Sequence, residues 1–319
     1  NELKDDIDFW TFLQYEFFKQ WKNLKAYANS KKIEIIGDIP IYVAEDSVDV
    51  WTNPQDFFLD SDLHPSVVSG CPPDAFSKTG QLWGNPIYNW PHHRNTGFGW
   101  WKKRIMESLK LYDVIRIDHF RGFEAYWEIP AGEETAVNGR WVKGPGIDLF
   151  NAIRAQLGDI KIIAEDLGYI TPSLLAFREA TKIPGMKVLQ FAFDTREESD
   201  YLPHNYPKDC VVYTGTHDND TVMGWLEESG REEDVEFCKK YLRLTEEEGY
   251  NWGFIKGAWS SVANVSIALF QDFIGTGSES RMNIPSTMGW WKWRAEKKDI
   301  TNALADKIYD ITKTYGRLK

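Results

Sequence analysis

One short stretch, Asp113-Val-Ile-Arg-Ile-Asp-His-Phe-Arg-Gly122, brings an arginine, an aspartate and a histidine to the end of a β-branched run. In a strand, residues two apart share a face, so Arg116 and Asp118 project together while Ile115 and Ile117 face the opposite layer. A neighbouring guanidinium keeps a carboxylate ionised, and a nucleophilic aspartate must be both ionised and poorly solvated. The pattern therefore indicates a catalytic strand end, with a structural Arg–Asp ion pair as the alternative.

Acidic residues stand at the ends of two further predicted strands. The run Ile160-Lys-Ile-Ile-Ala-Glu-Asp-Leu-Gly168 carries Glu165, and Val211-Val-Tyr-Thr-Gly-Thr-His-Asp-Asn219 carries His217 and Asp218 at its tip. Each acid alone fits a helix cap or an ion pair. Three carboxylates at one rim repel one another, which makes a purely structural explanation difficult.

Cleavage of a glycosidic bond is the chemistry that uses such a set of acids. It needs one ionised carboxylate as nucleophile, one protonated acid for the leaving oxygen, and further groups that stabilise an oxocarbenium-like transition state. We assign Asp118 as the nucleophile and Glu165 as the acid that later acts as base. Asp218 and His217 are assigned to ring hydroxyls and to transition-state stabilisation.

Strands that alternate with helices must position these side chains. Apolar residues at helical spacing predict a helix over residues 8–30, and the next β-branched run ends at Asp38, just before Pro40. Thr171-Pro172 has the hydroxyl N-cap and the first-position proline of a helix start. The six predicted strands lie within residues 33–40, 113–118, 160–168, 187–194, 211–219 and 265–271, and further helices are predicted over 100–111 and 146–157.

Strands with helices between them and acids at their carboxyl ends describe a parallel α/β fold, and the recurring acids favour a TIM (β/α)8 barrel. Such a barrel needs eight strands. We therefore expect residues 1–319 to form a single catalytic barrel domain that lacks the first two strand–helix units at its N-terminus. A doubly wound open sheet is the alternative, but the chain has no glycine-rich phosphate loop to hold a nucleotide.

Residues 44–99 are rich in proline, glycine, asparagine and aspartate and lack a sustained helical or alternating period. Structureless loops of this length are rare unless they are functional, so we expect an inserted substrate-binding loop region here. Its small residues, amides, carboxylates and aromatic rings suit the recognition of polyhydroxyl ligands. A stiffened surface lobe is the alternative interpretation.

The composition favours a neutral ligand. A net charge of -11 argues against nucleic acid or an anionic membrane surface as a partner. No apolar run approaches the roughly 20 residues of a membrane span, and three widely spaced cysteines favour a cytoplasmic location. No histidine cluster predicts a metal site, and we expect no cofactor. The 15 tryptophans are more than a core usually needs, so some are expected to face a sugar, with an aromatic core as the alternative.

Several motifs together resemble a known family. Arg116-Ile-Asp-His119, Ala164-Glu-Asp-Leu-Gly168 and Gly215-Thr-His-Asp-Asn219 are similar to strand-end regions of the α-amylase clan. Within that clan, the chain resembles the amylomaltases, which are 4-α-glucanotransferases also called disproportionating enzymes. The segments that carry this second resemblance, which covers nearly the whole chain, are Gly37-Asp-Ile-Pro-Ile-Tyr-Val43, Pro72-Pro-Asp-Ala-Phe-Ser77 and Gly80-Gln-Leu-Trp-Gly84. Ordinary α-amylases carry an Asn-His pair in place of Tyr42-Val43, which makes the resemblance specific.

The resemblance implies transfer of α-1,4-glucan segments between malto-oligosaccharides by a retaining double displacement. It gives the nucleophile, acid/base and stabiliser roles to Asp118, Glu165 and Asp218. The donor subsite is expected to be lined by Asp38, Arg116, His119 and His217, with Asn219 as a further substrate-binding residue. The loop that bears Asp74, Ser77, Gln81 and Trp83 is expected to cover the glucan chain.

The chain departs from the family pattern in two places. The first two barrel strands of the family are not found, and in the closing segment Arg281-Met-Asn-Ile-Pro-Ser-Thr-Met-Gly-Trp-Trp-Lys-Trp-Arg294, Ser286 and Gly289 stand where glycine and asparagine are more familiar. A hydrolase of the same clan and a catalytically silent glucan-binding protein are the competing functions. A metal-dependent hydrolase is disfavoured because His119 and His217 follow their strands singly.

Overall fold

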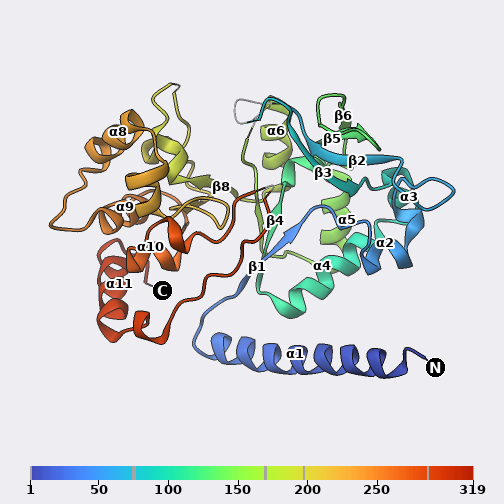
Figure 1. Ribbon diagram of the computed structural model, residues 1–319, viewed down its shortest axis with the longest axis horizontal. Helices are drawn as coiled ribbons and strands as arrows, with labels where there is room; N and C mark the ends of the chain where they lie inside the picture. Colours follow the sequence, from blue (N-terminus) through green and yellow to red (C-terminus); the bar gives the residue numbers. More distant parts are fainter. Residues whose placement is uncertain (1, 74–76, 169–170, 197, 286, 319) are drawn as a thin grey trace. The chain divides into compact units, whose positions relative to one another are not determined.

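The structure, a computed structural model, describes residues 2–73, 77–168, 171–196, 198–285 and 287–318. The chain folds as two compact units, Asn1–Ile183 and Pro184–Lys319. Each unit contains its own three-stranded parallel sheet. Figure 1 traces both units in chain order.

The parallel sheet of the first unit has the strand order β1-β4-β7. β1 spans Ile36–Pro40, β4 spans Val114–Asp118 and β7 spans Ile162–Ala164. The register pairs Pro40 with Asp118, and Ile117 with Ala164. The carboxyl ends of these strands therefore lie at one edge of the sheet, which brings Asp118 and Glu165 side by side.

Three predicted helices accompany this sheet: α4 Gly99–Leu111, α5 Ile147–Leu157 and α6 Pro172–Thr181. The N-cap prediction is confirmed, since the Thr171 hydroxyl accepts a hydrogen bond from the amide of Leu174 at 3.2 Å. Ile115 and Ile117 are almost fully buried, as the strand alternation predicts. They pack in one core with Phe120, Phe150 and other residues of the unit.

A second sheet of the first unit is antiparallel, with the order β3-β2-β5-β6, and the sequence analysis does not predict it. Its strands are β2 Val67–Cys71, β3 Gln81–Pro86, β5 Ala125–Pro130 and β6 Arg140–Lys143. Residues 44–99 also hold the short helices α2 Val48–Thr52 and α3 Trp90–Asn95. The region is thus more structured than its composition indicates, and its role as a substrate-binding insertion stays a prediction.

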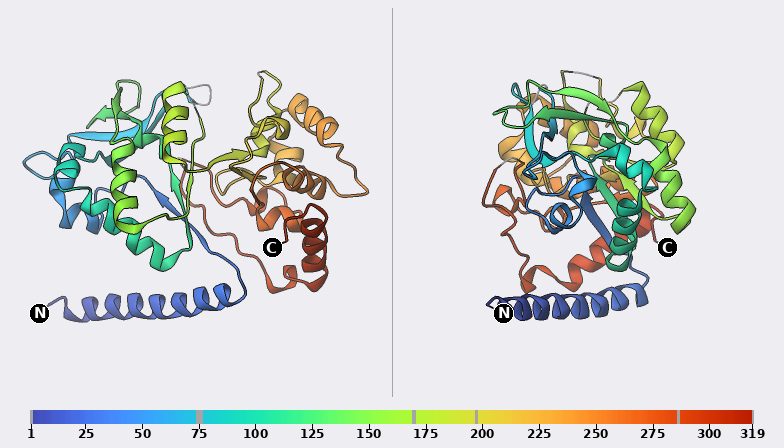
Figure 2. Two further views of the ribbon diagram at one scale, coloured as in Figure 1. Left: turned by 180° about the vertical axis from the view of Figure 1, so that it is seen from behind. Right: turned by 90° about the vertical axis from the view of Figure 1, so that its right-hand side faces the viewer.

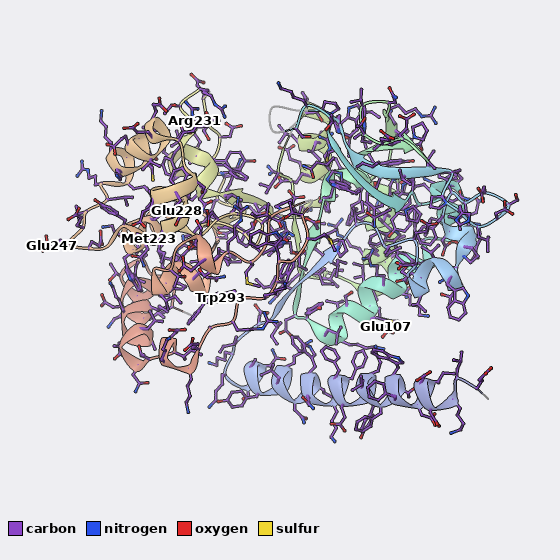
Figure 3. The ribbon with its side chains drawn as sticks, in the orientation of Figure 1. Glu107, Met223, Glu228, Arg231, Glu247 and Trp293 are labelled. Atoms are coloured by element: carbon purple, nitrogen blue, oxygen red, sulfur yellow. The ribbon has the colours of Figure 1, made fainter. Side chains whose placement is uncertain are left out.

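Helix α1 spans Lys4–Ser30, so it begins four residues before the predicted start, and none of its residues is buried. Figure 2 shows it along one side of the first unit in both views, and Figure 3 shows its side chains projecting from the helix. Its C-terminal half is anchored by side chains. Trp21 Nε1 donates to the carbonyl of Leu111 at 2.8 Å, and Lys25 Nζ donates to the carbonyl of Tyr112 at 2.9 Å.

The second unit is built on the parallel sheet β10-β9-β8. Its strands are β8 Gly185–Val188, β9 Cys210–Tyr213 and β10 Val265–Ile267. The predicted strand over residues 187–194 is wrong in extent, because Leu189–Phe193 forms a 3-10 helix. The helices of this unit are α7 Val222–Gly224, α8 Glu232–Leu242, α9 Tyr250–Trp259, α10 Phe270–Ile274 and α11 Asn302–Thr314.

The observed fold is mixed α/β, and all six predicted strands occur in parallel sheets. Ile36–Pro40 is the first parallel strand expected from the sequence, but the expected end at Asp38 is wrong, because the strand continues through Pro40. β1 stands at the end of the order β1-β4-β7, where a proline is tolerated. Over the described part of the chain, no helix has the length and apolar character needed to cross a lipid bilayer.

Candidate active site

Arg116 lies between two acids at the edge of the first unit's parallel sheet. Its Nη1 atom is 2.8 and 2.7 Å from the two carboxylate oxygens of Asp38, and 3.4 Å from Oδ1 of Asp118. Burial alone would lower the pKa of Arg116, but the charge and hydrogen bonds of Asp38, with the charge of Asp118, raise it. The expected Arg116–Asp118 contact is confirmed. The side chain of Asp118 is 48% exposed, more than expected for a poorly solvated nucleophile.

Glu165 follows β7, and its carboxylate is held by two backbone amides. The amide of His119 donates to Oε2 at 2.7 Å, and the amide of Leu167 donates to Oε1 at 2.9 Å. Loss of solvent around the carboxyl group, which is the largest cause, and the negative charge of Asp118 both raise the pKa of Glu165, which is about 7 after all influences act. Arg116 and the two amides act in the opposite direction. Burial therefore keeps a proton available on Glu165 near neutral pH.

His119 occupies the left-handed region with a φ of 51°. Its Nε2 atom is buried and has no hydrogen-bond partner among the described residues, and burial lowers its pKa to about 3. The ring packs edge-on against Trp83 with 4.6 Å between the ring centroids. Trp83 Nε1 donates to Gln81 Oε1 at 3.1 Å. A neutral imidazole and an aromatic ring thus lie together beside the acids.

The four residues predicted to lie on the substrate-covering loop differ in what they contact. Gln81 and Trp83 belong to β3 and approach His119 as described above. The hydroxyl of Ser77 donates to the carbonyl of Gly80 at 2.7 Å, so it closes a turn of the loop. Asp74, the fourth predicted loop residue, lies outside the described residues.

In the second unit, the predicted residues His217, Asp218 and Asn219 follow β9 directly. His217 Nε2 lies 3.6 Å from Oδ1 of Asp218. The side-chain oxygen of Asn219 accepts hydrogen bonds from the amide and the hydroxyl of Thr216 at 2.8 and 2.9 Å. Asn219 thus closes the turn that presents His217 and Asp218, and both of these side chains are partly exposed.

Two residues that the sequence analysis does not assign to the site hold Asp218. Asn283 Nδ2 donates to Oδ1 of Asp218 at 2.6 Å. Arg281 Nη2 donates to the backbone carbonyl of Asp218 at 2.7 Å, and its Nε donates to the carbonyl of Asn283 at 2.9 Å. The family-like segment 281–294 was the available signal, but the contact joins residues more than 60 positions apart.

The buried carboxylate of Asp272 accepts hydrogen bonds from both ends of the segment that contains this turn. Asp272 is fully buried, and it accepts a hydrogen bond from the Thr214 hydroxyl at 2.5 Å and one from the amide of Val222 at 2.8 Å. Burial raises the pKa of Asp272 to about 6. Asp272 therefore ties together the two ends of the segment that carries Asp218.

Comparison with known proteins identifies the family. A family model described as 4-alpha-glucanotransferase matches residues 1–300. The chain belongs to this family. A 4-alpha-glucanotransferase of Clostridium butyricum is 61% identical over 319 residues, covering 99% of this chain and 66% of the relative. The Streptococcus pneumoniae 4-alpha-glucanotransferase is 48% identical over 318 residues, covering 99% of this chain and 63% of the relative. The chain thus spans slightly less than two thirds of the length of these family members.

Two solved structures described as amylomaltases resemble the chain as well. An amylomaltase from Streptococcus agalactiae in complex with acarbose has a TM-score of 0.95 at 43% identity, covering 100% of this chain and 65% of that one. An amylomaltase from Corynebacterium glutamicum has a TM-score of 0.78 at 17% identity, covering 97% and 50%, and shows the shared fold alone.

Proposed function

We propose that this protein is a 4-α-glucanotransferase that moves α-1,4-glucan segments between malto-oligosaccharides by a retaining double displacement. The observation that carries the proposal is the environment of Glu165, a carboxyl group with its pKa raised to about 7, next to an aspartate contacted by Arg116. A protonatable acid beside an ionised carboxylate is the pair that this chemistry needs. Membership of the 4-alpha-glucanotransferase family supports the choice of reaction.

In the first step, Asp118 attacks the anomeric carbon of the donor, and Glu165 gives its proton to the leaving glycosidic oxygen. The products are a glycosyl ester on Asp118 and a shortened glucan. Ester formation removes the negative charge of Asp118, so one cause of the raised pKa of Glu165 disappears. Glu165 is then a carboxylate and can take the proton of the incoming hydroxyl.

In the second step, the 4-hydroxyl of an acceptor glucan attacks the glycosyl ester, and Glu165 accepts its proton. Asp118 leaves as a carboxylate, and a new α-1,4 bond has formed. Asp218 and His217 are proposed to bind ring hydroxyls and to stabilise the oxocarbenium-like state. Asp38 and Arg116 are proposed to line the donor subsite with the neutral His119.

The proposed architecture is a TIM-type barrel to which the two parallel sheets contribute six strands. Its support is the parallel pairing within each unit, the acids at the strand ends, and the likeness to the Streptococcus agalactiae amylomaltase. The single catalytic domain over residues 1–319, with residues 44–99 as its insertion, likewise stays a prediction. A cytoplasmic location is proposed as well, and its support is the wide spacing of the three cysteines in the sequence.

Replacement of the nucleophile tests the proposal. Asp118→Asn should reduce formation of longer oligosaccharides from maltotriose by at least about 10³-fold, while binding of maltoheptaose persists. The matched control is Asp159→Asn, which changes an exposed acid between α5 and β7 and should keep full activity. Steady conversion of maltotriose to glucose and maltose alone by the unsubstituted protein would contradict transfer. Substantial activity in Asp118→Asn would contradict the assigned nucleophile.

A further inference from the structure

Trp291 has an unusual backbone conformation for a bulky residue. Its φ is +66°, in the left-handed region that disfavours every side chain larger than hydrogen. The amide of Trp291 donates to the carbonyl of Met282 at 2.8 Å, so a backbone hydrogen bond holds Trp291 in place. Such strain persists only where the surrounding contacts impose it, and it is concentrated at functional sites.

The indole of Trp291 lies next to the turn of the second unit that carries His217 and Asp218. The ring centroids of Trp291 and His217 are 5.1 Å apart, with the planes tilted by 43°. The start of the same segment holds Asp218 through Arg281 and Asn283. Arg281, Asn283 and Trp291 therefore contact the two residues at the tip of the turn. Trp293, two residues further on, is labelled in Figure 3.

The exposure of Trp291 argues against a purely structural role. Its side chain is 52% exposed, so apolar burial does little to offset the backbone strain. The tilted contact with His217 leaves part of the indole surface open beside the exposed portions of His217 and Asp218. An open aromatic face next to hydrogen-bonding groups is the combination that recognises the apolar face and the hydroxyls of a pyranose ring.

We infer that Trp291 is a further substrate-contacting residue, whose indole packs against the glucose ring that His217 and Asp218 bind. The ligand is a neutral sugar, because the Asp218 carboxylate, 3.6 Å from Nε2 of His217, repels an anion. The inference rests on the proposed function for its choice of ligand and adds a residue that contributes binding energy and no proton transfer.

Binding to an inactive variant tests this assignment directly. In the full chain carrying Asp118→Asn, the dissociation constant of maltoheptaose is measured by calorimetric titration. Adding Trp291→Ala should raise that constant about tenfold or more, as loss of a central aromatic contact does, and Trp291→Phe should raise it less. The matched control is Trp290→Ala, because the Trp290 indole donates to the hydroxyl of Thr287 at 2.6 Å within its own segment. This control should stay within about twofold of the parent.

A glycine variant separates binding from folding. Trp291→Gly removes the indole and also relieves the left-handed strain, so its Tm should not fall while its dissociation constant rises as in Trp291→Ala. A lowered Tm in Trp291→Gly, unchanged binding in Trp291→Ala, or no binding of maltoheptaose to the Asp118→Asn parent would each overturn the inference. If the parent binds, Trp291→Ala weakens binding and the unsubstituted protein makes no transfer product, the proposed function fails and the Trp291 contact stands.

Discussion

The carboxyl group of Glu165 is governed by opposing influences within a few ångströms. Loss of solvent and the charge of Asp118 favour its protonated form, while Arg116 and the amides of His119 and Leu167 favour the ionised form. The two influences that favour the protonated form are the larger, so the pKa of Glu165 is raised to about 7. A group balanced in this way can give and accept a proton within one catalytic cycle.

The balance predicts the pH dependence of transfer. The proposed first step needs protonated Glu165, so kcat/KM for maltotriose should fall as the pH rises through about 7. The measurement is a pH profile of kcat/KM over pH 5–9, about two units on either side. With α-maltosyl fluoride as donor, the leaving fluoride needs little help from an acid, and the fall above neutral pH should be much smaller. An identical fall with both donors would assign the pKa to another group.

A second prediction concerns the amide that faces Asp218. Asn283→Asp places a carboxylate where the amide now donates at 2.6 Å, so two like charges meet. We expect kcat/KM to fall about 100-fold or more, compared with about tenfold for Asn283→Ala, which only removes a hydrogen bond. Steady-state kinetics with maltotriose measure both.

Asn264→Asp is the matched control for this pair. The Asn264 amide also donates to an aspartate, Asp209, at 3.2 Å, but on an exposed surface. The substitution should therefore leave kcat/KM within about twofold. Equal losses in Asn283→Asp and Asn283→Ala would show that the charge of Asp218 does not matter.

The sequence predicts the three candidate acids better than it predicts the residues that hold them in place. Asp118, Glu165 and Asp218 are visible because each follows a β-branched run, and a strand end is a local signal. Asn283 and Arg281 lie in an irregular segment, and their contact with Asp218 depends on a chain return that no local pattern encodes. The strained position of Trp291 is also hidden, because a left-handed φ is expected at glycine and not at tryptophan.

At the scale of elements, the parallel strands are short and apolar, and their partners follow after intervening helices. This regularity makes all six predictable from the sequence. The antiparallel strands are different. β2 and β3 contain Gly70, Gly84 and Pro86, and β2 pairs with β5, whose residues come about 60 positions later in the chain. Turn-forming residues inside these strands conceal their period. The missed sheet is therefore a consequence of composition and of non-local pairing.

Strand β1 contains a glycine, Gly37, whose lack of a side chain leaves room for the ring of Tyr112. A Cβ atom at Gly37 would lie 2.1 Å from the ring of Tyr112, closer than any real contact. Gly37→Ala should therefore destabilise the protein by about 1–3 kcal/mol through overpacking, and it should raise KM because the neighbouring Asp38 is displaced. Urea unfolding and steady-state kinetics measure the two effects.

Two comparisons test the cause of this effect. Gly99→Ala is the control, since a Cβ there meets open space at the start of α4, and it should be neutral or slightly stabilising. In the double variant Gly37→Ala/Tyr112→Ala the clash is absent, so the two substitutions should cost less together than the sum of their separate effects. Simple additivity would show that the ring is not the obstacle.

At the scale of the whole molecule, each unit has a separate hydrophobic core. The first contains the side chains around Ile117 and Phe150, and the second those around Phe193 and Val212. Two cores are compatible with two independent domains and also with one cooperative domain. The single barrel domain predicted over residues 1–319 requires the second case.

A matched pair of core substitutions distinguishes these cases. Leu149 and Leu189 are both fully buried, Leu149 in the core of the first unit and Leu189 in the core of the second. Leu149→Ala and Leu189→Ala should each lower stability by about 2–5 kcal/mol. If the chain is one domain, calorimetry shows a single transition that moves as a whole in either variant, and the double variant shows the summed loss.

The control is Leu175→Ala, at a side chain that is 42% exposed on α6, which should change stability by about 0.5 kcal/mol or less. Two resolved transitions, with Leu149→Ala moving one and Leu189→Ala the other, would contradict the single domain.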